Sequence, residues 1–355
     1  MPQDFNTTAS VRPGEELDTV KLSAYLRHAL PEIHGGLAVE QFPSGHSNLT
    51  YLVRIGDQEY VLRRPPFGTK VRTAHDMGRE FRVLSKLHKV YAPAPRPILY
   101  CEDLEVMGAP FYLMTRLRGL VIRKHLPDFM VDRPDLGRDL SIAVIDNLAT
   151  LHSLDLEAAG LADFGKPRGY VRRQIEGWSK RWADAQTVSI PDMEELGRWL
   201  SDRMPAESGA ALIHNDYKLD NILLDPDDVT RITGVLDWEM ATVGDPWMDL
   251  GTALSYWIGA SDPVEFQTVR FSPTTQPGFL SRRQMLDRYQ ERTGWHVMDP
   301  VYYYVYGMFK LAVILQQIYY RYVHGLTKDD RFAGLGEVVR ALARQGTGAA
   351  GEGKM

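Results

Sequence analysis

The chain has 355 residues, enough for two lobes with substantial cores, and its 44% hydrophobic and 25% charged residues are ordinary for a folded globular protein. Its net charge of -5 gives no general electrostatic reason to bind nucleic acid, and its single cysteine, Cys101, excludes an internal disulfide framework and a cysteine-rich zinc site. The first 18 residues contain no apolar run, so we expect no secretory signal and a cytoplasmic protein.

The first third of the chain is rich in strand signals. Gln41 to Ile55 and Glu59 to Arg63 flank a turn at 56–58 and predict a hairpin. Apolar residues at helical spacing then predict a helix over about 77–87, which ends at a proline-rich run. A strand is expected after this run, and another over Pro110 to Leu117, before Gly119.

From about Asp135 the pattern becomes helical. An apolar stripe over 142–151 predicts one helix, and Tyr170 to Ala185 and Met193 to Met204 predict two more. Short strands are expected at 211–213, 222–224 and 232–236, followed by further helices. The apolar segment Tyr302 to Tyr320 is interrupted by Lys310 and two glutamines, so we expect a buried helix and no membrane contact.

One segment carries the chemistry. His214-Asn215-Asp216-Tyr217-Lys218-Leu219-Asp220-Asn221 lies between two short apolar runs, and Asp237 follows a third. This is the pattern H-x-D-x-x-x-x-N followed by an Asp at the end of a strand. Turn-forming residues between strands would explain the Asp and Asn alone, but not the His and Asn at this spacing.

Phosphoryl transfer explains these residue types, because it depends on positioning and on neutralising charge at phosphate oxygens. In the kinase pattern Asp216 orients the acceptor hydroxyl and accepts its proton. Asn221 and Asp237 supply oxygen ligands for Mg²⁺. Lys218 is a candidate contact for the γ-phosphate, with a solvated loop lysine as the alternative.

The chain resembles the aminoglycoside phosphotransferase-like and choline kinase-like small-molecule kinases. It is most similar to the branch also found fused to acyl-CoA dehydrogenases. The resemblance runs from about Leu37 to Val339 and includes, besides 214–221, the segments 42–48, 60–66, 79–80, 148–152, 237–246 and 309–312. It implies an α+β, bilobal protein kinase-like fold, with a small β-rich N-lobe and a larger, mostly helical C-lobe.

The resemblance also divides the chain. We expect a flexible N-terminus over 1–20, a nucleotide-binding N-lobe over 21–118 and a C-lobe with the catalytic loop, metal and acceptor sites over 119–345. A Gly- and Ala-rich end, 346–355, is expected to be flexible.

The nucleotide site follows from the same resemblance. The loop between the first two strands supplies Ser44, Gly45, Ser47 and Asn48, although it lacks the G-x-G-x-x-G signature. Arg63 replaces the strand lysine expected to hold the α- and β-phosphates, with Arg64 as the competitor if the register differs by one residue. Glu80 is expected to pair with this arginine. Thr115 and Leu117 are expected to offer backbone groups to the base.

The implied function is an ATP- or GTP-dependent, Mg²⁺-dependent phosphotransferase that acts on a hydroxyl of a small metabolite. The branch suggests a hydroxyacyl compound or its CoA thioester; choline-like, amino-alcohol and aminoglycoside acceptors remain open. The alternative hypothesis is a nucleotide-binding module without catalytic activity. The presence of Asp216, Asn221 and Asp237, which the kinase pattern needs for catalysis, argues against it. Arg63 and the glycine-poor loop argue against a protein kinase. Trp178 and Trp182 lie one helical turn apart, in a core stripe or in a wall of the acceptor pocket.

Overall fold

The computed structural model describes residues 7–43, 48–67, 76–269, 271–327 and 329–355. The chain forms two compact units. The first comprises Met1–Val121, Ala158–Leu161 and Ile222–Ala241, and the second comprises Ile122–Glu157, Ala162–Asn221 and Thr242–Met355. Sequence analysis divided the chain into continuous lobes at 118/119. The structure differs, because the segment after the catalytic loop returns to the first unit.

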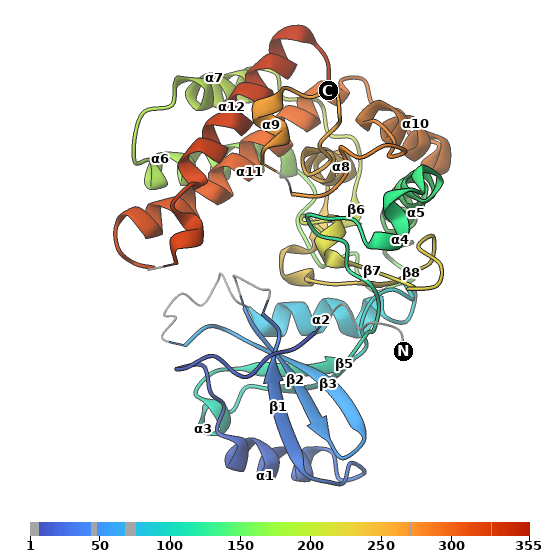
Figure 1. The fold of residues 1–355 in the computed structure, drawn as a ribbon, viewed down its shortest axis with the longest axis vertical. Coiled ribbons are helices and arrows are strands. Elements are labelled where there is room, and N and C mark those ends of the chain that lie inside the picture. The colour runs from blue at the N-terminus through green and yellow to red at the C-terminus, as the bar shows by residue number, and fades with distance from the viewer. Residues whose placement is uncertain (1–6, 44–47, 68–75, 270, 328) are drawn as a thin grey trace. The chain divides into compact units, whose positions relative to one another are not determined.

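The first unit is built on a five-stranded antiparallel sheet (Figure 1). Its spatial order is β1-β2-β3-β5-β4, so β3 lies in the middle. The strands are β1 (Leu37–Gln41), β2 (Leu49–Ile55), β3 (Gln58–Arg64), β4 (Pro97–Cys101) and β5 (Phe111–Thr115). The predicted hairpin arm 41–55 is thus two strands, with β2 pairing β3 across the turn at Gly56.

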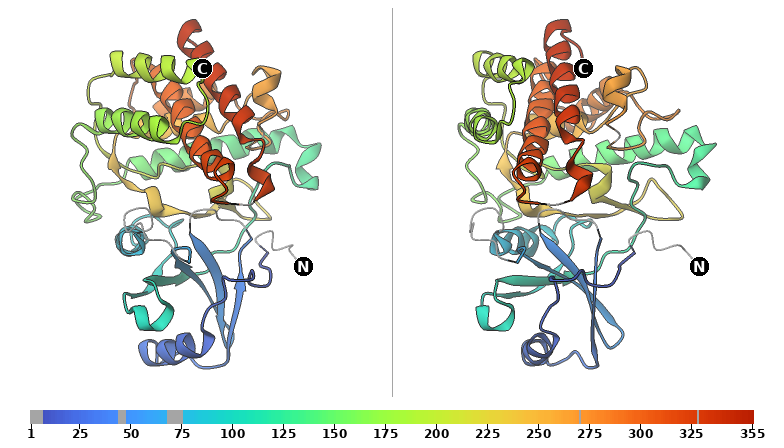
Figure 2. Two further views of the ribbon diagram at one scale, coloured as in Figure 1. Left: turned by 90° about the vertical axis from the view of Figure 1, so that its left-hand side faces the viewer. Right: turned by 60° about the vertical axis from the view of Figure 1, so that its left-hand side comes forward.

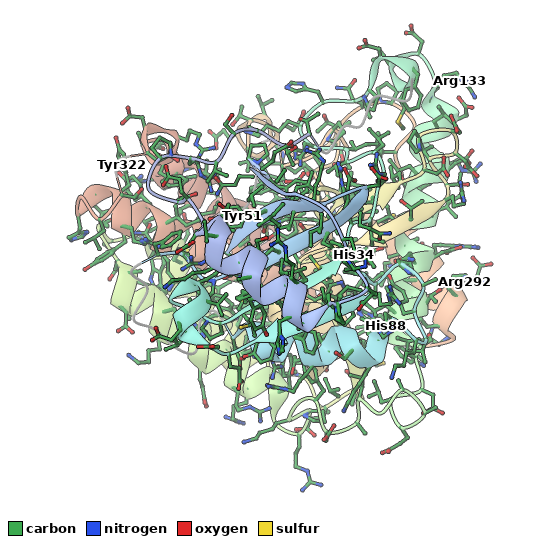
Figure 3. The ribbon with its side chains drawn as sticks, turned by 90° about the horizontal axis from the view of Figure 1, so that it is seen from below. His34, Tyr51, His88, Arg133, Arg292 and Tyr322 are labelled. Carbon is green, nitrogen blue, oxygen red and sulfur yellow. The ribbon has the colours of Figure 1, made fainter. Side chains whose placement is uncertain are left out.

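Helices cover both faces of this sheet. On one face, α1 (Thr19–Ala29) and α3 (Leu104–Met107) pack on alternate residues of the strands, such as Tyr60 and Leu62 of β3. Figure 3 shows α1 lying across the strands beside Tyr51. On the other face, α2 (Met77–Leu87) packs against β4 and β5. Because side chains alternate along a strand, Arg63 points to the α2 face.

Residues 7–18, which precede α1, are held to the first unit, in contrast to the flexibility expected over 1–20. Ala9 forms a bridge with Gln41 at the edge of the sheet, and the Tyr51 hydroxyl donates to the Glu15 carbonyl oxygen at 2.7 Å. The helix α1 begins at Thr19, after the N-cap Asp18. Its leucines bury against the sheet, which explains the order of this segment.

The first unit ends with a short hairpin of β7 (Ile222–Leu224) and β8 (Ile232–Val235) and the 3-10 turn η2 (Trp238–Met240). Leu120 bridges to Leu224 and so joins the hairpin to the chain that leaves β5. The α2 helix packs on η2, and the Arg79 guanidinium donates to the Ala241 carbonyl oxygen at 2.9 Å. These contacts place the residue before η2, Asp237, on the first unit.

The second unit is mostly helical. It contains a two-stranded ladder of β6 (Ala211–Ile213) and β9 (Thr242–Gly244) and the 3-10 turns η1 (Leu219–Asn221) and η3 (Asp330–Phe332). Its helices are α4 (Asp128–Val131), α5 (Pro134–His152), α6 (Tyr170–Ala185), α7 (Pro191–Asp202), α8 (Pro246–Ser255), α9 (Val264–Gln267), α10 (Arg282–Thr293), α11 (Pro300–Val323) and α12 (Leu335–Glu352).

The predicted buried helix over 302–320 is confirmed as α11, which packs against α6, α7, α8 and α12. Both views of Figure 2 show α11 and α12 running side by side. The closest approach is to α8, where a Cβ on Gly251 would lie 2.1 Å from the Tyr303 carbonyl oxygen and one on Gly307 would lie 2.4 Å from that of Gly251. Only glycine permits this backbone contact. In the described part of the chain, no helix is long and apolar enough to cross a membrane.

The C-terminal end differs from the expected flexible tail. Helix α12 continues to Glu352, and Gly346 and Ala349 are buried. A Cβ on Gly346 would lie 2.9 Å from the Leu196 side chain of α7. The small residues that suggested a flexible tail instead allow α12 to approach its neighbours closely.

Candidate active site

The loop 214–221 connects β6 to β7 and begins with a left-handed residue. Asn215 has φ 68°, and Asp237 is the other non-glycine residue with positive φ among those the structure describes. Asn and Asp tolerate this conformation better than other side chains that carry a Cβ, but it still costs energy. Both residues lie in the motif that sequence analysis assigned to catalysis.

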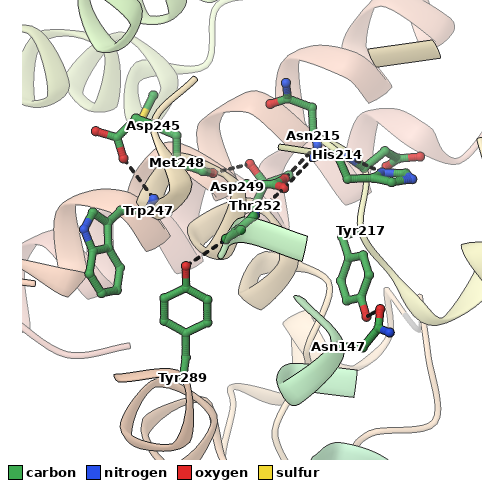
Figure 4. Close-up of polar contacts among 12 residues, drawn as sticks. Asn147, His214, Asn215, Tyr217, Asp245, Trp247, Met248, Asp249, Thr252 and Tyr289 are labelled. Carbon is green, nitrogen blue, oxygen red and sulfur yellow. Dashed lines mark hydrogen bonds and ion pairs between the residues drawn. The ribbon is translucent and has the colours of Figure 1, made fainter. Parts of the chain in front are cut away.

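Asp249 of α8 holds the backbone of this loop (Figure 4). Its Oδ2 accepts the His214 N–H at 2.7 Å, and its Oδ1 accepts the Asn215 N–H at 2.7 Å. The side chain is fully buried. Since strained backbone persists only where its surroundings fix it, Asp249 stabilises the left-handed turn.

A buried chain of hydrogen bonds supports Asp249 from α5 and α10. The His152 Nε2 lies 3.1 Å from Asp249 Oδ2, and its Nδ1 lies 2.7 Å from the Tyr289 hydroxyl. Burial alone would raise the pKa of Asp249, but the hydrogen bonds from His152 and the His214 backbone lower it below its usual value. Asp249 is therefore an ionised acceptor of backbone N–H groups.

Lys310 of α11 approaches the loop from the other side. Its Nζ donates to the Asn215 carbonyl oxygen at 2.7 Å and lies 3.4 Å from Asn215 Oδ1. Burial lowers the pKa of Lys310 to about 8, against the attraction of Asp249 and Asp216. Asn215 is thus held through its N–H by α8 and through its carbonyl by α11.

We expect Lys310 to make stability depend on pH. Its pKa is about 8 in the folded chain and 10.5 ordinarily, so the unfolded chain binds more protons between these values and stability rises with pH across the window. The shift corresponds to about 3 kcal/mol. Urea unfolding at pH 7.5 and 10.5 should show this rise in the wild type, and Lys310→Met should lack it. Parallel pH dependences would contradict the assignment.

The Asp216 carboxylate receives three donors. Lys218 Nζ lies 3.1 Å from Oδ1 and 2.9 Å from Oδ2, the Tyr256 hydroxyl donates to Oδ1 at 2.8 Å, and Asn221 Nδ2 donates to Oδ2 at 3.0 Å. His214 Nδ1 accepts the Asp216 N–H at 3.2 Å, so His214 stabilises the loop. The arrangement holds a half-buried carboxylate in one orientation, which suits a group that must orient a hydroxyl.

The contacts of Asn221 with Asp216 fix the orientation of the Asn221 side-chain amide. Its Nδ2 donates both to the Asp216 backbone oxygen, at 2.9 Å, and to Asp216 Oδ2. Both partners are acceptors, so the nitrogen must face them and the amide oxygen must face away. That oxygen is the atom a hard cation would use.

The first unit holds a second charged cluster. Arg63 Nη1 lies 2.5 Å from Glu80 Oε1, and its Nη2 lies 2.9 Å from Asp237 Oδ1 and 3.6 Å from Glu239 Oε2. Burial alone would lower the pKa of Arg63, but the carboxylates of Glu80 and Asp237 raise it well above its usual value. Asp237 is one-third exposed, whereas Arg63 and Glu80 are buried.

Arg64 lies on the opposite face of β3. Its Nε donates to the Pro65 carbonyl oxygen at 3.1 Å, and its guanidinium lies 3.6 Å from the centre of the Phe67 ring. The expected pairing of Glu80 with an arginine is therefore made by Arg63. A one-residue change of register would exchange the two, as sequence analysis noted.

The remaining nucleotide-site residues are placed only in part. Ser44, Gly45 and Ser47 lie outside the described residues. Asn48 is buried, and its Nδ2 donates to Glu239 Oε2 at 2.5 Å. The Thr115 N–H already donates to the Arg96 carbonyl oxygen at 2.8 Å, which leaves less of its backbone for a nucleotide base than expected. Leu117 is half-buried beyond the end of β5.

Sequence analysis missed Tyr256. No motif contains it, and the only signal is its place seven residues after Asp249, two turns along the same helix. Trp178 and Trp182 are both buried on α6, as a core stripe requires. Asp245 is the N-cap of α8, where it accepts the Trp247 N–H at 2.9 Å.

Metal binding by these residues is consistent with the donor chemistry. In the described part of the chain no three His, Cys, Asp or Glu side chains gather as a cage. The Asn221 amide oxygen in the second unit and the partly exposed Asp237 carboxylate in the first are each oxygen groups of the kind that Mg²⁺ binds, and this ion usually takes only one or two protein ligands together with waters and phosphate oxygens.

Comparisons with known proteins agree with this geometry. The model of the phosphotransferase enzyme family matches residues 38–298. Acyl-CoA dehydrogenase family member 11 of Gallus gallus is 32% identical over 357 residues, which cover 96% of this chain and 44% of that protein. The chain thus spans less than half the length of this relative.

Solved structures extend the comparison. A putative aminoglycoside phosphotransferase from Ralstonia eutropha is 32% identical with a TM-score of 0.79, covering 95% of this chain and 99% of that one. An aminoglycoside phosphotransferase in complex with AMP-PNP and hygromycin B has 16% identity and a TM-score of 0.57, covering 92% and 99%, and shares the fold alone. The expected kinase-like fold class is confirmed.

Proposed function

The chain belongs to the phosphotransferase enzyme family, and from this premise we propose that it transfers the γ-phosphate of ATP to a hydroxyl group of a small metabolite. The family and enzyme class expected from sequence are thereby confirmed. The observation that carries the proposal is the Asp216 carboxylate, held by three donors on a loop that α8 and α11 fix from two sides.

Asp216 is proposed to act on the acceptor. Its carboxylate would accept the hydrogen bond of the attacking hydroxyl, orient the oxygen toward phosphorus and take the proton late in the transfer. Lys218, already beside this carboxylate, would turn to the γ-phosphate as negative charge moves there.

The cluster of the first unit is proposed to hold the nucleotide. Arg63 keeps its charge and its fork of donors, and its Nε has no hydrogen-bond partner among the described residues. Such a group suits the α- and β-phosphates. Glu80 fixes the guanidinium from α2, and Asn48, with Ser44, Gly45 and Ser47, belongs to the loop proposed to cover the phosphates. Thr115 and Leu117 remain the proposed contacts for the base.

Asn221 and Asp237 are proposed to hold Mg²⁺. When bound, the ion would neutralise charge on the phosphate oxygens. The two residues would supply oxygen ligands. Because Asn221 Nδ2 donates to Asp216, the Asn221 amide oxygen faces away from Asp216 and could bind the ion. We propose ATP as the phosphate donor, and the assay below compares it with GTP.

The proposed acceptor is a hydroxyacyl compound or its CoA thioester, in the cytoplasm. The support is the likeness to acyl-CoA dehydrogenase family members over nearly all of this chain. An amino-alcohol or aminoglycoside acceptor is the alternative, since the Ralstonia eutropha relative carries the description of a putative aminoglycoside phosphotransferase.

A panel assay tests the proposal. The chain with ATP, or with GTP, and Mg²⁺ is given hydroxyacyl-CoA thioesters, the free hydroxy acids, choline, ethanolamine and an aminoglycoside, and phosphorylated product is measured by mass spectrometry. We expect product with one class and none when Mg²⁺ is removed by a chelator. Binding of ATP without transfer to any acceptor would instead identify a silent nucleotide-binding module.

Arg63→Lys should weaken ATP binding by roughly 10- to 100-fold, as expected for one lost charge-assisted hydrogen bond of about 1.5–3 kcal/mol. Lysine keeps the charge for the buried Glu80, whereas Arg63→Ala would leave that carboxylate unpaired and destabilise the unit. Calorimetric titration with Mg·ATP gives the affinity. Arg64→Lys is the matched control on the opposite face and should bind ATP normally; the reverse ranking would exchange the roles of the two arginines.

A further inference from the structure

Tyr256 joins the helix that holds the loop to the carboxylate that the loop presents. It is the C-cap residue of α8 and lies seven residues, or two turns, after Asp249. Asp249 binds the loop backbone, and the Tyr256 hydroxyl donates to Asp216 Oδ1 at 2.8 Å. One face of α8 therefore fixes both the main chain and the side chain of the acceptor-binding segment.

The three donors to Asp216 are not equivalent under the proposed function, on which this inference rests. Lys218 is needed at the γ-phosphate, whereas Asn221 can donate to Asp216 Oδ2 through its nitrogen and offer its amide oxygen to the metal at the same time. Tyr256 has no such second task and comes from a helix end rather than from the loop itself. We propose that Tyr256 is the positioning residue that holds Asp216 Oδ1, and so keeps the carboxylate aimed at the acceptor hydroxyl, when Lys218 turns to the γ-phosphate.

The surroundings of Tyr256 suit a fixed donor. The side chain is buried, and the Phe271 ring meets it edge-on with centroids 5.5 Å apart. The Ser272 hydroxyl donates to the Tyr256 carbonyl oxygen at 3.2 Å, and the Thr274 hydroxyl donates to that of Ile258 at 2.8 Å. Packing and these hydroxyl contacts hold both the ring and its backbone.

The hydroxyl also stays protonated. Burial raises the pKa of Tyr256 well above its usual value, and the neighbouring Asp216 carboxylate raises it further, whereas Lys218 lowers it. At physiological pH the group is thus a donor to Asp216 and does not act as a base. Its effect on the reaction must pass through the orientation of Asp216.

Tyr256→Phe removes this hydroxyl and keeps the ring. We expect kcat to fall by about 10- to 100-fold, because a small misplacement of a reacting group costs up to roughly this factor. The KM for ATP should change by less than about twofold, since Tyr256→Phe keeps the ring, whose centre lies 5.0 Å from Lys218 Nζ, and removes only a hydroxyl that donates to Asp216. If the Tyr256 hydroxyl had only a structural role, its removal would instead lower the stability of the fold and weaken the binding of both ATP and the acceptor.

The decisive measurement is a double-mutant cycle with Asp216→Asn, using the acceptor found in the panel assay. Tyr256→Phe should add less than about a twofold loss once Asp216 is replaced, because coupled residues are non-additive. Tyr302→Phe is the control: it removes another buried hydroxyl of the same unit, which donates to the Leu200 carbonyl oxygen at 3.0 Å, and should keep wild-type turnover. Thermal melting checks that each variant is folded.

The outcomes separate the inference from the proposed function. If the wild type and Tyr302→Phe transfer phosphate and Tyr256→Phe equals them, Tyr256 does not position Asp216, although the proposed function stands. A full multiplicative loss in the double mutant would also overturn the inference, because Tyr256 would then act independently of Asp216. If the wild type transfers phosphate to no acceptor, the proposed function fails and this inference fails with it.

Discussion

Asp216→Asn should lower phosphate transfer by about 10²–10⁴-fold, the range expected when a positioned acid–base group is lost. Asparagine keeps the shape of the side chain and its contacts with Tyr256 and Lys218 in part, but it cannot take the proton of the acceptor hydroxyl. The measurement is turnover at saturating ATP and acceptor. We expect the loss in kcat rather than in the KM for the nucleotide.

ATP affinity provides the internal check for this variant. The Asp216 side chain is proposed to act on the acceptor and not to hold the nucleotide, so calorimetry with Mg·ATP should give nearly the wild-type value. Near-wild-type turnover in Asp216→Asn would show that the mechanism is wrong. Loss of ATP binding in a folded variant would move Asp216 from the acceptor to the metal.

Asp249→Asn should destabilise the protein by about 2–5 kcal/mol and also abolish most turnover, because the carboxylate is a buried acceptor of several donors. It accepts the N–H groups of both His214 and Asn215. An amide offers one oxygen, so one of these N–H groups must face the amide nitrogen and lose its partner. Urea unfolding measures the loss of stability, and the transfer assay measures the loss of turnover.

The matched control is Asp287→Asn on α10. Asp287 is exposed and pairs with Arg283 one turn away at 3.0 Å, an interaction worth little in water. We expect this variant to match the wild type in both assays. Equal stabilities for Asp249→Asn and the wild type would mean that the left-handed turn at Asn215 does not depend on α8.

The strand and helix order of this chain was largely readable without its structure. Short apolar runs predicted β6, β7 and β8 to within one residue, and helical spacing predicted α5, α6 and α11. These signals are local, because the period of the apolar residues reflects the geometry of the element itself. The same dependence on local signals explains why the predictions of flexible termini were wrong for the described residues at both ends of the chain. Glycine and alanine at 346–355 predicted flexibility, although α12 continues to Glu352 and Gly346 packs against α7 and α11.

Part of the candidate active site could also be predicted from local sequence. The spacing of His214, Asp216 and Asn221 singled out one loop, since a short segment between two strands must bring its side chains together. The choice between Arg63 and Arg64 was not local, because two adjacent residues of one strand differ only in which face of the sheet they occupy. The pairing of β3 with its neighbours and the position of α2 decided that Arg63 meets Glu80 and Asp237.

By itself, then, the sequence determined the family, the kinase-like fold class and the loop that carries Asp216, because motif spacing and apolar periodicity are properties of neighbouring residues. Only the tertiary structure decided how that loop is held. Asp249, Tyr256 and Lys310 lie 33, 40 and 94 residues beyond Asp216 along the chain, and no periodicity links them to it. They converge because α8 and α11 pack backbone to backbone through Gly251 and Gly307, a contact between elements that local sequence does not encode.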